Sequence, residues 1–119
     1  MNEIASTITA YYALKPAQYS VLASLTLSQG LDDAGVCEQS LSLLMQQEFG
    51  RSGPCLHLEF HGVRNLMLQQ PELSLMSIGH IQISAGSEGP NIQSKYLVRD
   101  PEQERVIWFE CRDFVSYVE

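Results

Sequence analysis

The chain has 119 residues, 45% of them hydrophobic and 18% charged, the size and balance of one soluble globular domain with a single core. Its net charge of −7 and its lack of a basic run argue against nucleic-acid binding and favour a basic partner, although acidity also serves solubility alone. No apolar run is long enough to span a membrane, and the first residues do not resemble a signal peptide. We therefore expect a cytoplasmic protein, and the absence of nucleotide-binding glycine motifs gives no reason to expect a cofactor.

The first part of the chain, residues 1–50, is predicted to be helical. Within residues 1–14 the apolar spacing is that of a short amphipathic helix, from Ile4, Ile8, Tyr11 and Tyr12. Residues 16–28 are ambiguous, because their apolar positions mostly alternate with serine and threonine as in a strand. Pro16 at the start and Gly30 after the end favour a helix instead.

A further helix is predicted over residues 34–49. Asp32 or Asp33 can cap its N-terminus, and Gly50 supplies a C-terminal stop. Its apolar stripe consists of Val36, Cys37, Leu41, Leu44 and Met45.

The pattern changes to that of strands over residues 51–119, beginning with a strand over 55–68. Side chains on a strand point alternately to opposite faces. We therefore expect one face to be buried, that of Leu56, Leu58 and Phe60. The opposite face carries Cys55, His57, Glu59 and His61. Gly62 and Val63 are predicted to form a bulge within this strand.

Three more strands are predicted, over residues 73–84, 92–99 and 105–114. They are separated by turns at 69–72 and 100–103 and by a glycine-rich loop at 85–91. In the last strand the core face carries Ile107, Phe109 and Cys111, opposite Trp108, Glu110 and Arg112. Helices followed by strands with short connections predict a single α+β domain over residues 1–119, with N-terminal helices packed on one face of a four-stranded antiparallel meander.

The most specific enzymatic pattern is the row of His57, Glu59 and His61 on one strand face. Imidazole and carboxylate are ligands for zinc and other transition metals, so this row is a candidate metal or ligand site. Three ligands on one flat strand would make a strained tetrahedron, and no fourth ligand stands out. A polar, solvent-facing row explains the same residues without a site.

The cysteines Cys37, Cys55 and Cys111 are odd in number and far apart in the sequence. That is a poor disulfide framework and agrees with a reducing compartment, so we expect free, buried thiols. A nucleophilic pair of Cys111 with His57 or His80 is the alternative. The predicted core position of Cys111 argues for an inert thiol.

Trp108 and Arg112 are candidates for a protein interface. Exposed tryptophan and arginine are enriched at interface centres, and both residues fall on the predicted outer face of the last strand. The alternative is that Trp108 faces inward or is covered.

The second half of the chain resembles a family of small, uncharacterised bacterial proteins. The resemblance is carried by Leu58-x-Phe60-x-Gly62-Val63-Arg64-Asn65-Leu66, Tyr96-x-Val98-x-Asp100 and Phe109-Glu110-Cys111-Arg112-Asp113-Phe114. Some compact α+β proteins of similar texture are immunity-like partners in bacterial toxin systems, and the resemblance implies no catalytic residues. We therefore expect a non-enzymatic protein-interaction module, an acidic partner of a basic protein or a homodimer. The alternative is a small enzyme or ligand binder using the His57/Glu59/His61 face.

Overall fold

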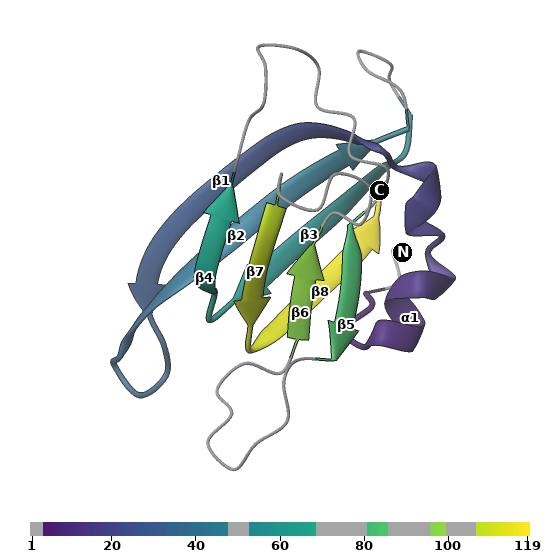
Figure 1. Cartoon of the computed structure of the whole chain (residues 1–119). Helices are drawn as coiled ribbons and strands as arrows, with labels where there is room; N and C mark the ends of the chain where they lie inside the picture. Colours follow the sequence, from purple (N-terminus) through teal and green to yellow (C-terminus); the bar gives the residue numbers. More distant parts are fainter. Residues whose placement is uncertain (1–3, 48–52, 69–80, 86–95, 100–106) are drawn as a thin grey trace.

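The computed structural model describes residues 4–47, 53–68, 81–85, 96–99 and 107–119, and these residues form a largely β structure (Figure 1). Two four-stranded antiparallel sheets are present, sheet A in the order β1-β2-β3-β8 and sheet B in the order β4-β7-β6-β5. The strands are β1 (Val21–Leu31), β2 (Cys37–Gln46), β3 (Cys55–His61), β4 (Arg64–Leu68), β5 (Gln82–Ala85), β6 (Tyr96–Arg99), β7 (Ile107–Cys111) and β8 (Asp113–Val118). One short helix, α1 (Ile8–Ala13), and one 3-10 turn, η1 (Pro16–Gln18), precede them.

The predicted α+β fold with helices packed on a meander is wrong. Of the three helices expected within residues 1–50, only the first is present, as α1. The segments predicted as helices over 16–28 and 34–49 instead form β1 and β2, which pair from Val21↔Gln46 to Leu31↔Cys37. Long antiparallel pairing provides hydrogen-bond partners for the backbone N–H and C=O groups of both segments and places their leucines opposite one another. This tertiary context overrides the local helix signals.

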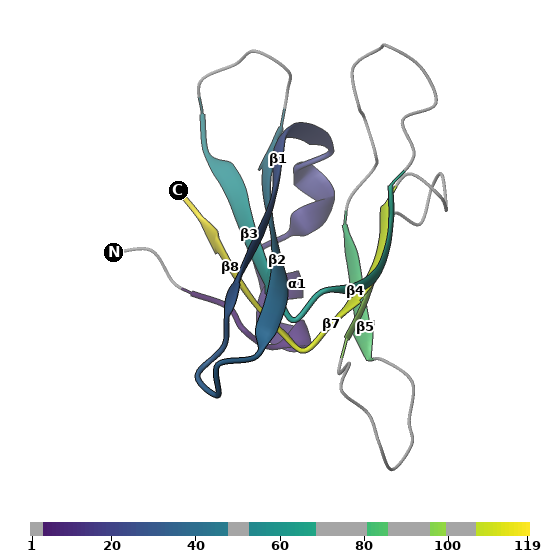
Figure 2. The same cartoon turned by 90° about the vertical axis from the view of Figure 1, so that its left-hand side faces the viewer.

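The two sheets share two bent strands. Strand β3 continues into β4 through Gly62, and β7 continues into β8 through Arg112, so both segments pass from one sheet to the other. The bulge predicted at Gly62 and Val63 therefore lies at a corner between the sheets, which Figure 2 shows edge-on as two layers. The predicted meander is also wrong at its start, because β4 pairs with β7 and not with β5.

The buried faces predicted for the first and last strands are confirmed, although the layer that covers them is not the expected one. Leu56, Leu58 and Phe60 are buried, as are Ile107, Phe109 and Cys111. They pack against each other across the two sheets, with the rings of Phe60 and Phe109 4.8 Å apart in a T-shaped arrangement. Sheet B, and not a helical layer, covers the apolar face of β3. The turns predicted at 69–72 and 100–103, and residues 86–91 of the predicted loop, lie outside the described residues.

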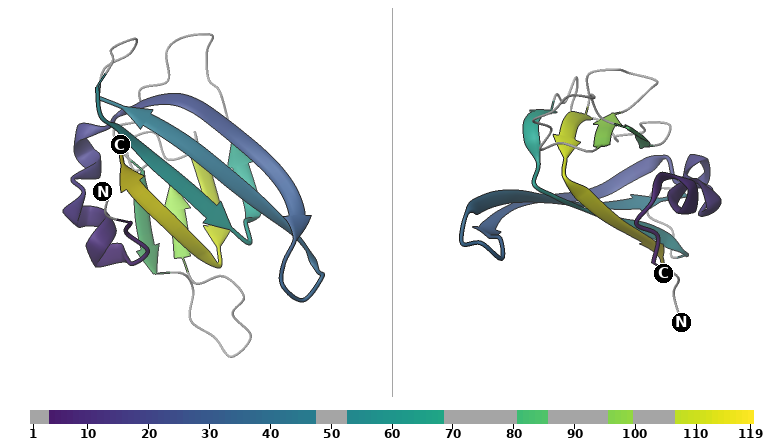
Figure 3. Two further views of the ribbon diagram at one scale, coloured as in Figure 1. Left: turned by 180° about the vertical axis from the view of Figure 1, so that it is seen from behind. Right: turned by 90° about the horizontal axis from the view of Figure 1, so that it is seen from below.

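Helix α1 lies beside the β5 and β8 side of the two sheets (Figure 3). Thr7 caps it, its side-chain oxygen accepting a hydrogen bond from the Ala10 amide at 3.2 Å. Tyr11 is buried and its hydroxyl donates to the Ile81 carbonyl, which ties the helix to the strand end. In the described part of the chain, no helix has the length and apolar content needed to cross a membrane.

Candidate functional site

The face of sheet A that points away from sheet B carries a continuous band of mostly polar side chains, which we call the outer face. The strand register places Thr26 of β1 opposite Ser42 of β2, and Ser42 opposite Glu59 of β3. One step along the strands, His57 of β3 lies between Leu44 of β2 and Tyr117 of β8. Alternation therefore brings residues from four separate segments of the sequence to one surface.

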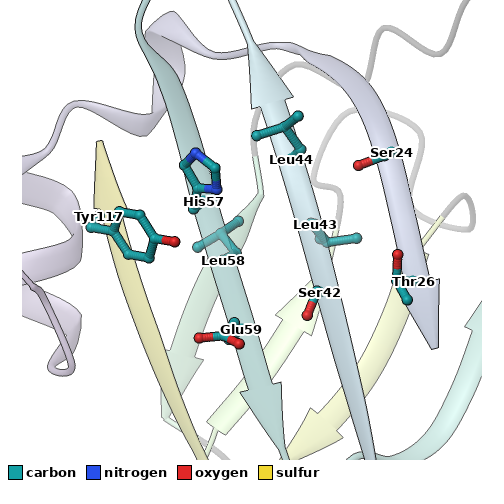
Figure 4. Close-up of a pocket in the computed structure, with 9 residues that line it drawn as sticks. All are labelled: Ser24, Thr26, Ser42, Leu43, Leu44, His57, Leu58, Glu59 and Tyr117. Carbon is teal, nitrogen blue, oxygen red and sulfur yellow. The ribbon is translucent and has the colours of Figure 1, made fainter. Parts of the chain in front are cut away.

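A hollow of about 280 Å³ opens on this outer face (Figure 4). Its lining side chains come from all four strands of sheet A: Ser24, Thr26, Ser42, Leu44, His57, Glu59 and Tyr117, with Leu43 and Leu58 beneath them. One wall is made of hydroxyl groups and the other of aromatic rings. Its volume is close to the lower end of the range usual for small-molecule pockets, about 300–1,000 Å³.

The aromatic wall is a stacked pair. The rings of His57 and Tyr117 lie 4.7 Å apart and within 4° of parallel. The two strands are hydrogen-bonded neighbours with these residues directly opposite, so the stack is held by the sheet register itself. The wall is therefore preorganised for contact with a flat group.

Glu59 supplies negative charge to the hollow. Its side chain is exposed, and among the described residues no cation pairs with it. The ion pairs of the described chain lie at the corner of the sheets, where Arg112 contacts Glu38 at 2.7 Å and Asp113 at 3.0 Å. The carboxylate of Glu59 is therefore available to a positively charged group from outside the described chain.

The candidate metal ligands His57, Glu59 and His61 do share one strand face, as their spacing predicts. Positions four apart on a strand are separated by about 13 Å, and only His57 and Glu59 line the hollow. His61 lies beside Ser40, with 3.5 Å between its Nδ1 atom and the serine hydroxyl. In the residues that the structure describes, no three His, Cys, Asp or Glu side chains form a group that could hold a metal ion. The metal hypothesis stays a prediction.

Cys111 is buried between the sheets, and burial raises the pKa of its thiol to about 12, with a smaller contribution from the charge of Asp113. Such a thiol is a poor nucleophile at neutral pH. His57 lies on the outer face of sheet A, away from the core, while His80 lies outside the described residues. All three cysteines are free, but only Cys111 is buried as expected: Cys55 is half-buried, and Cys37 is exposed near the β1–β2 turn.

Trp108 and Arg112, the interface candidates, occupy different parts of the molecule. Trp108 is half-buried on the side of β7 that faces away from sheet A, opposite Met67 and Arg99 in the register. Arg112 lies at the corner between β7 and β8, and its hydrogen bonds to Asp113 and then Glu38 raise the pKa of its guanidinium. An interface role for either residue stays a prediction.

Most of the residues that line the hollow were not predicted from the sequence. His57 and Glu59 were candidates, but Tyr117 and the hydroxyl wall of Ser24, Thr26 and Ser42 were not. The available signal was the alternation of hydroxyl and apolar residues over residues 20–28, which a strand explains and a helix does not. No local signal places Tyr117 beside His57, because that neighbourhood depends on the pairing of β3 with β8.

Two packed antiparallel sheets with a hollow on the outer face of sheet A define a small, largely β protein. A family model described as immunity protein PIM8 matches residues 3–117, which is nearly the whole chain, and the chain belongs to this immunity protein family. The immunity-like resemblance expected from the sequence is thereby confirmed, and with it a protein-interaction role toward a toxin partner. Neither a search of curated proteins nor one of solved structures gave a match.

Proposed function

We propose that the protein neutralises a protein toxin by binding it at the hollow of the outer face, and not by catalysis. We further propose that the toxin presents a basic surface there. Membership of the immunity protein family supports a protein partner. The net charge of −7 supports a basic one, because an acidic surface attracts a basic protein during encounter and repels acidic competitors.

The hollow has the groups that an arginine side chain of a partner would need. A guanidinium stacks well on aromatic rings, and the flat pair of His57 and Tyr117 offers such a surface. Its N–H groups donate in parallel to a carboxylate, which Glu59 supplies from the same strand as His57. The hydroxyls of Thr26 and Ser42 can accept further hydrogen bonds from the opposite wall.

One observation supports the outer face of sheet A as the proposed toxin-binding face. Glu59 is an exposed carboxylate that lines a hollow beside a stacked aromatic pair, and no described cation neutralises it. Aromatic residues together with a charged pair that loses water on binding are typical of the few residues that dominate interface energies.

The test is the affinity of wild-type protein and of Glu59→Gln for the toxin that the wild-type protein captures from its host, measured by titration calorimetry. The substitution removes one negative charge and keeps the shape of the side chain. We expect a loss of affinity of about tenfold or more, about 1.4 kcal/mol, because a desolvated cation in the toxin loses its partner. Protection of cells that express the toxin should fall in parallel.

The matched control is Glu110→Gln, which makes the same change in net charge on the outward side of sheet B. Glu110 accepts a hydrogen bond from the side-chain amide (Nδ2) of Asn65 at 2.7 Å, and glutamine retains an acceptor there. This variant should bind the toxin within about twofold of wild type, the range that general charge steering allows for a remote residue. Equal effects of the two variants, or no effect of Glu59→Gln, would show that the toxin docks elsewhere. The homodimer expected from the sequence stays a prediction.

A further inference from the structure

The two sheets have four edges, and three of them are protected within the described residues. The edge of β8 is bridged by Ala5, whose amide donates to the Ser116 carbonyl at 2.7 Å and whose carbonyl accepts from the Ser116 amide at 2.8 Å. The edge of β5 is covered by α1, where Tyr12 accepts a hydrogen bond from the Ile83 amide at 3.2 Å. The edge of β4 is short, and its register is broken between Arg64 and Met67. Such devices are typical of proteins that avoid edge-to-edge pairing.

The fourth edge, that of β1, is neither bridged nor covered by another described segment, and its one register shift, between Leu22 and Ser24, lies near the start of the strand. Strand β1 pairs only with β2 in the described chain, and from Ser24 to Leu31 its register is unbroken. Between Val21 and Leu31 it contains no proline and no charged residue, the two kinds of residue that usually block an edge. Figure 3 shows β1 as the outermost strand of its sheet. The strand therefore offers a long, regular row of backbone groups for pairing.

The same strand carries exposed leucines. Leu25, Leu27 and Leu31 share the inner face of sheet A, but the β1–β2 hairpin projects beyond sheet B, so its far end is uncovered (Figure 3). Leu27 is 49% exposed and Leu31 73% exposed, and Val36 across the turn is also exposed. The turn itself is closed by hydrogen bonds, because the Asp32 carboxylate accepts from the amides of both Ala34 and Val36 at 2.9 Å. An apolar patch thus lies beside the free edge on a preorganised arm.

We propose that the edge of β1 pairs antiparallel with the β1 edge of a second copy of this chain, joining two A sheets into one eight-stranded sheet. A second copy has the same unprotected edge, so a single two-fold contact gives the free backbone groups of both edges hydrogen-bond partners. Each chain carries a charge of −7, yet β1 is uncharged, so its pairing brings no like charges face to face. Pairing about Gln29 joins residues 27–31 of the two copies and places Leu27 of each copy opposite Leu31 of the other, and these side chains cover one another.

The test needs no toxin and is therefore independent of the proposed function. Sedimentation equilibrium of the purified chain, from about 1 to about 500 µM, should show the mass rising from 13.3 kDa toward twice that value. Leu31→Lys should weaken the dimer at least about tenfold, because lysine on an edge strand opposes strand addition. Hydrogen exchange of the β1 amides should slow with concentration in wild type and not in this variant. That second readout locates the contact, and circular dichroism shows whether the variant is folded.

The matched control is Ile4→Lys, which adds the same charge at a residue 65% exposed and remote in sequence from β1. It should dimerise as wild type does. Both substitutions reduce the net negative charge, so a loss confined to Leu31→Lys cannot come from general repulsion. A wild type that stays monomeric over the whole concentration range would overturn the proposal, and the β1 edge would then be available only to a strand of another protein. A dimer unaffected by Leu31→Lys would overturn it as well, since the contact would then lie elsewhere.

Discussion

Gly62 and Arg112 form the corner at which the two long strands pass between the sheets. Gly62 has a φ of +66°, a conformation that residues with a side chain rarely adopt, and a Cβ placed there would lie 2.9 Å from the Arg112 Cβ. The Arg112 amide donates to the His61 carbonyl at 2.9 Å, and the Val63 amide donates to the Gln39 carbonyl at 3.0 Å. The glycine signal in the sequence located this bend, but not its role as a link between layers.

At the residue scale we predict that Gly62→Ala destabilises the protein by about 3 kcal/mol. About 1–2 kcal/mol comes from the left-handed backbone conformation, and the rest comes from the displacement of Arg112 and its strand. Urea unfolding followed by circular dichroism measures the change in the free energy of unfolding.

Gly35→Ala is the control for this prediction. Gly35 has a φ of +79° in the β1–β2 turn, but nothing lies within 4 Å of the position that an alanine methyl group would take, so only the backbone contribution applies. We expect a loss of about 1 kcal/mol. Equal losses in the free energy of unfolding for the two variants would mean that the close approach of Gly62 to Arg112 contributes nothing to stability.

At the element scale, β2 shows why its strand was mistaken for a helix. The buried residues Leu41, Leu43 and Met45 alternate as a strand requires, but Leu44 adds an apolar residue on the polar face. Leu44 with Leu41 and Met45 then matches helical spacing. Leu44 lines the hollow of the outer face, where this sheet departs from the pattern of a simple solvent-facing strand. Strand β3 has no such residue, and its alternation gave the correct buried face.

The helical and extended forms of this segment make opposite predictions for adjacent leucines. In the strand, Leu43→Ala leaves a cavity between the sheets and should cost about 2–4 kcal/mol. Leu44→Ala removes a half-buried side chain from the outer face and should cost about 1 kcal/mol or less. Thermal and urea unfolding of both variants distinguish the cases. A larger loss for Leu44→Ala would support the helical stripe and contradict the described β2.

At the scale of the whole molecule, the alternation in the sequence predicted the polar face of β3, but not the arrangement of layers. The pairing of β3 with β8 and of β4 with β7 joins segments about 50 residues apart in the chain, and no local pattern encodes such contacts. Tyr117 reaches the hollow only through this pairing. The acidity of the chain and its resemblance to immunity-like proteins were visible in the sequence, while the place where a partner would bind required the fold.

The most direct test of the proposed binding face is a titration of ¹⁵N-labelled protein with the unlabelled toxin, followed by amide chemical shifts. Binding at the hollow predicts the largest shifts in the strands that form its walls, along β2, β3 and β8 around Ser42, His57, Glu59 and Tyr117. Amides of β5 and β6 on sheet B should change little, because the core separates them from the outer face. Shifts concentrated on sheet B, with β3 and β8 unchanged, would contradict the assignment of the toxin-binding face.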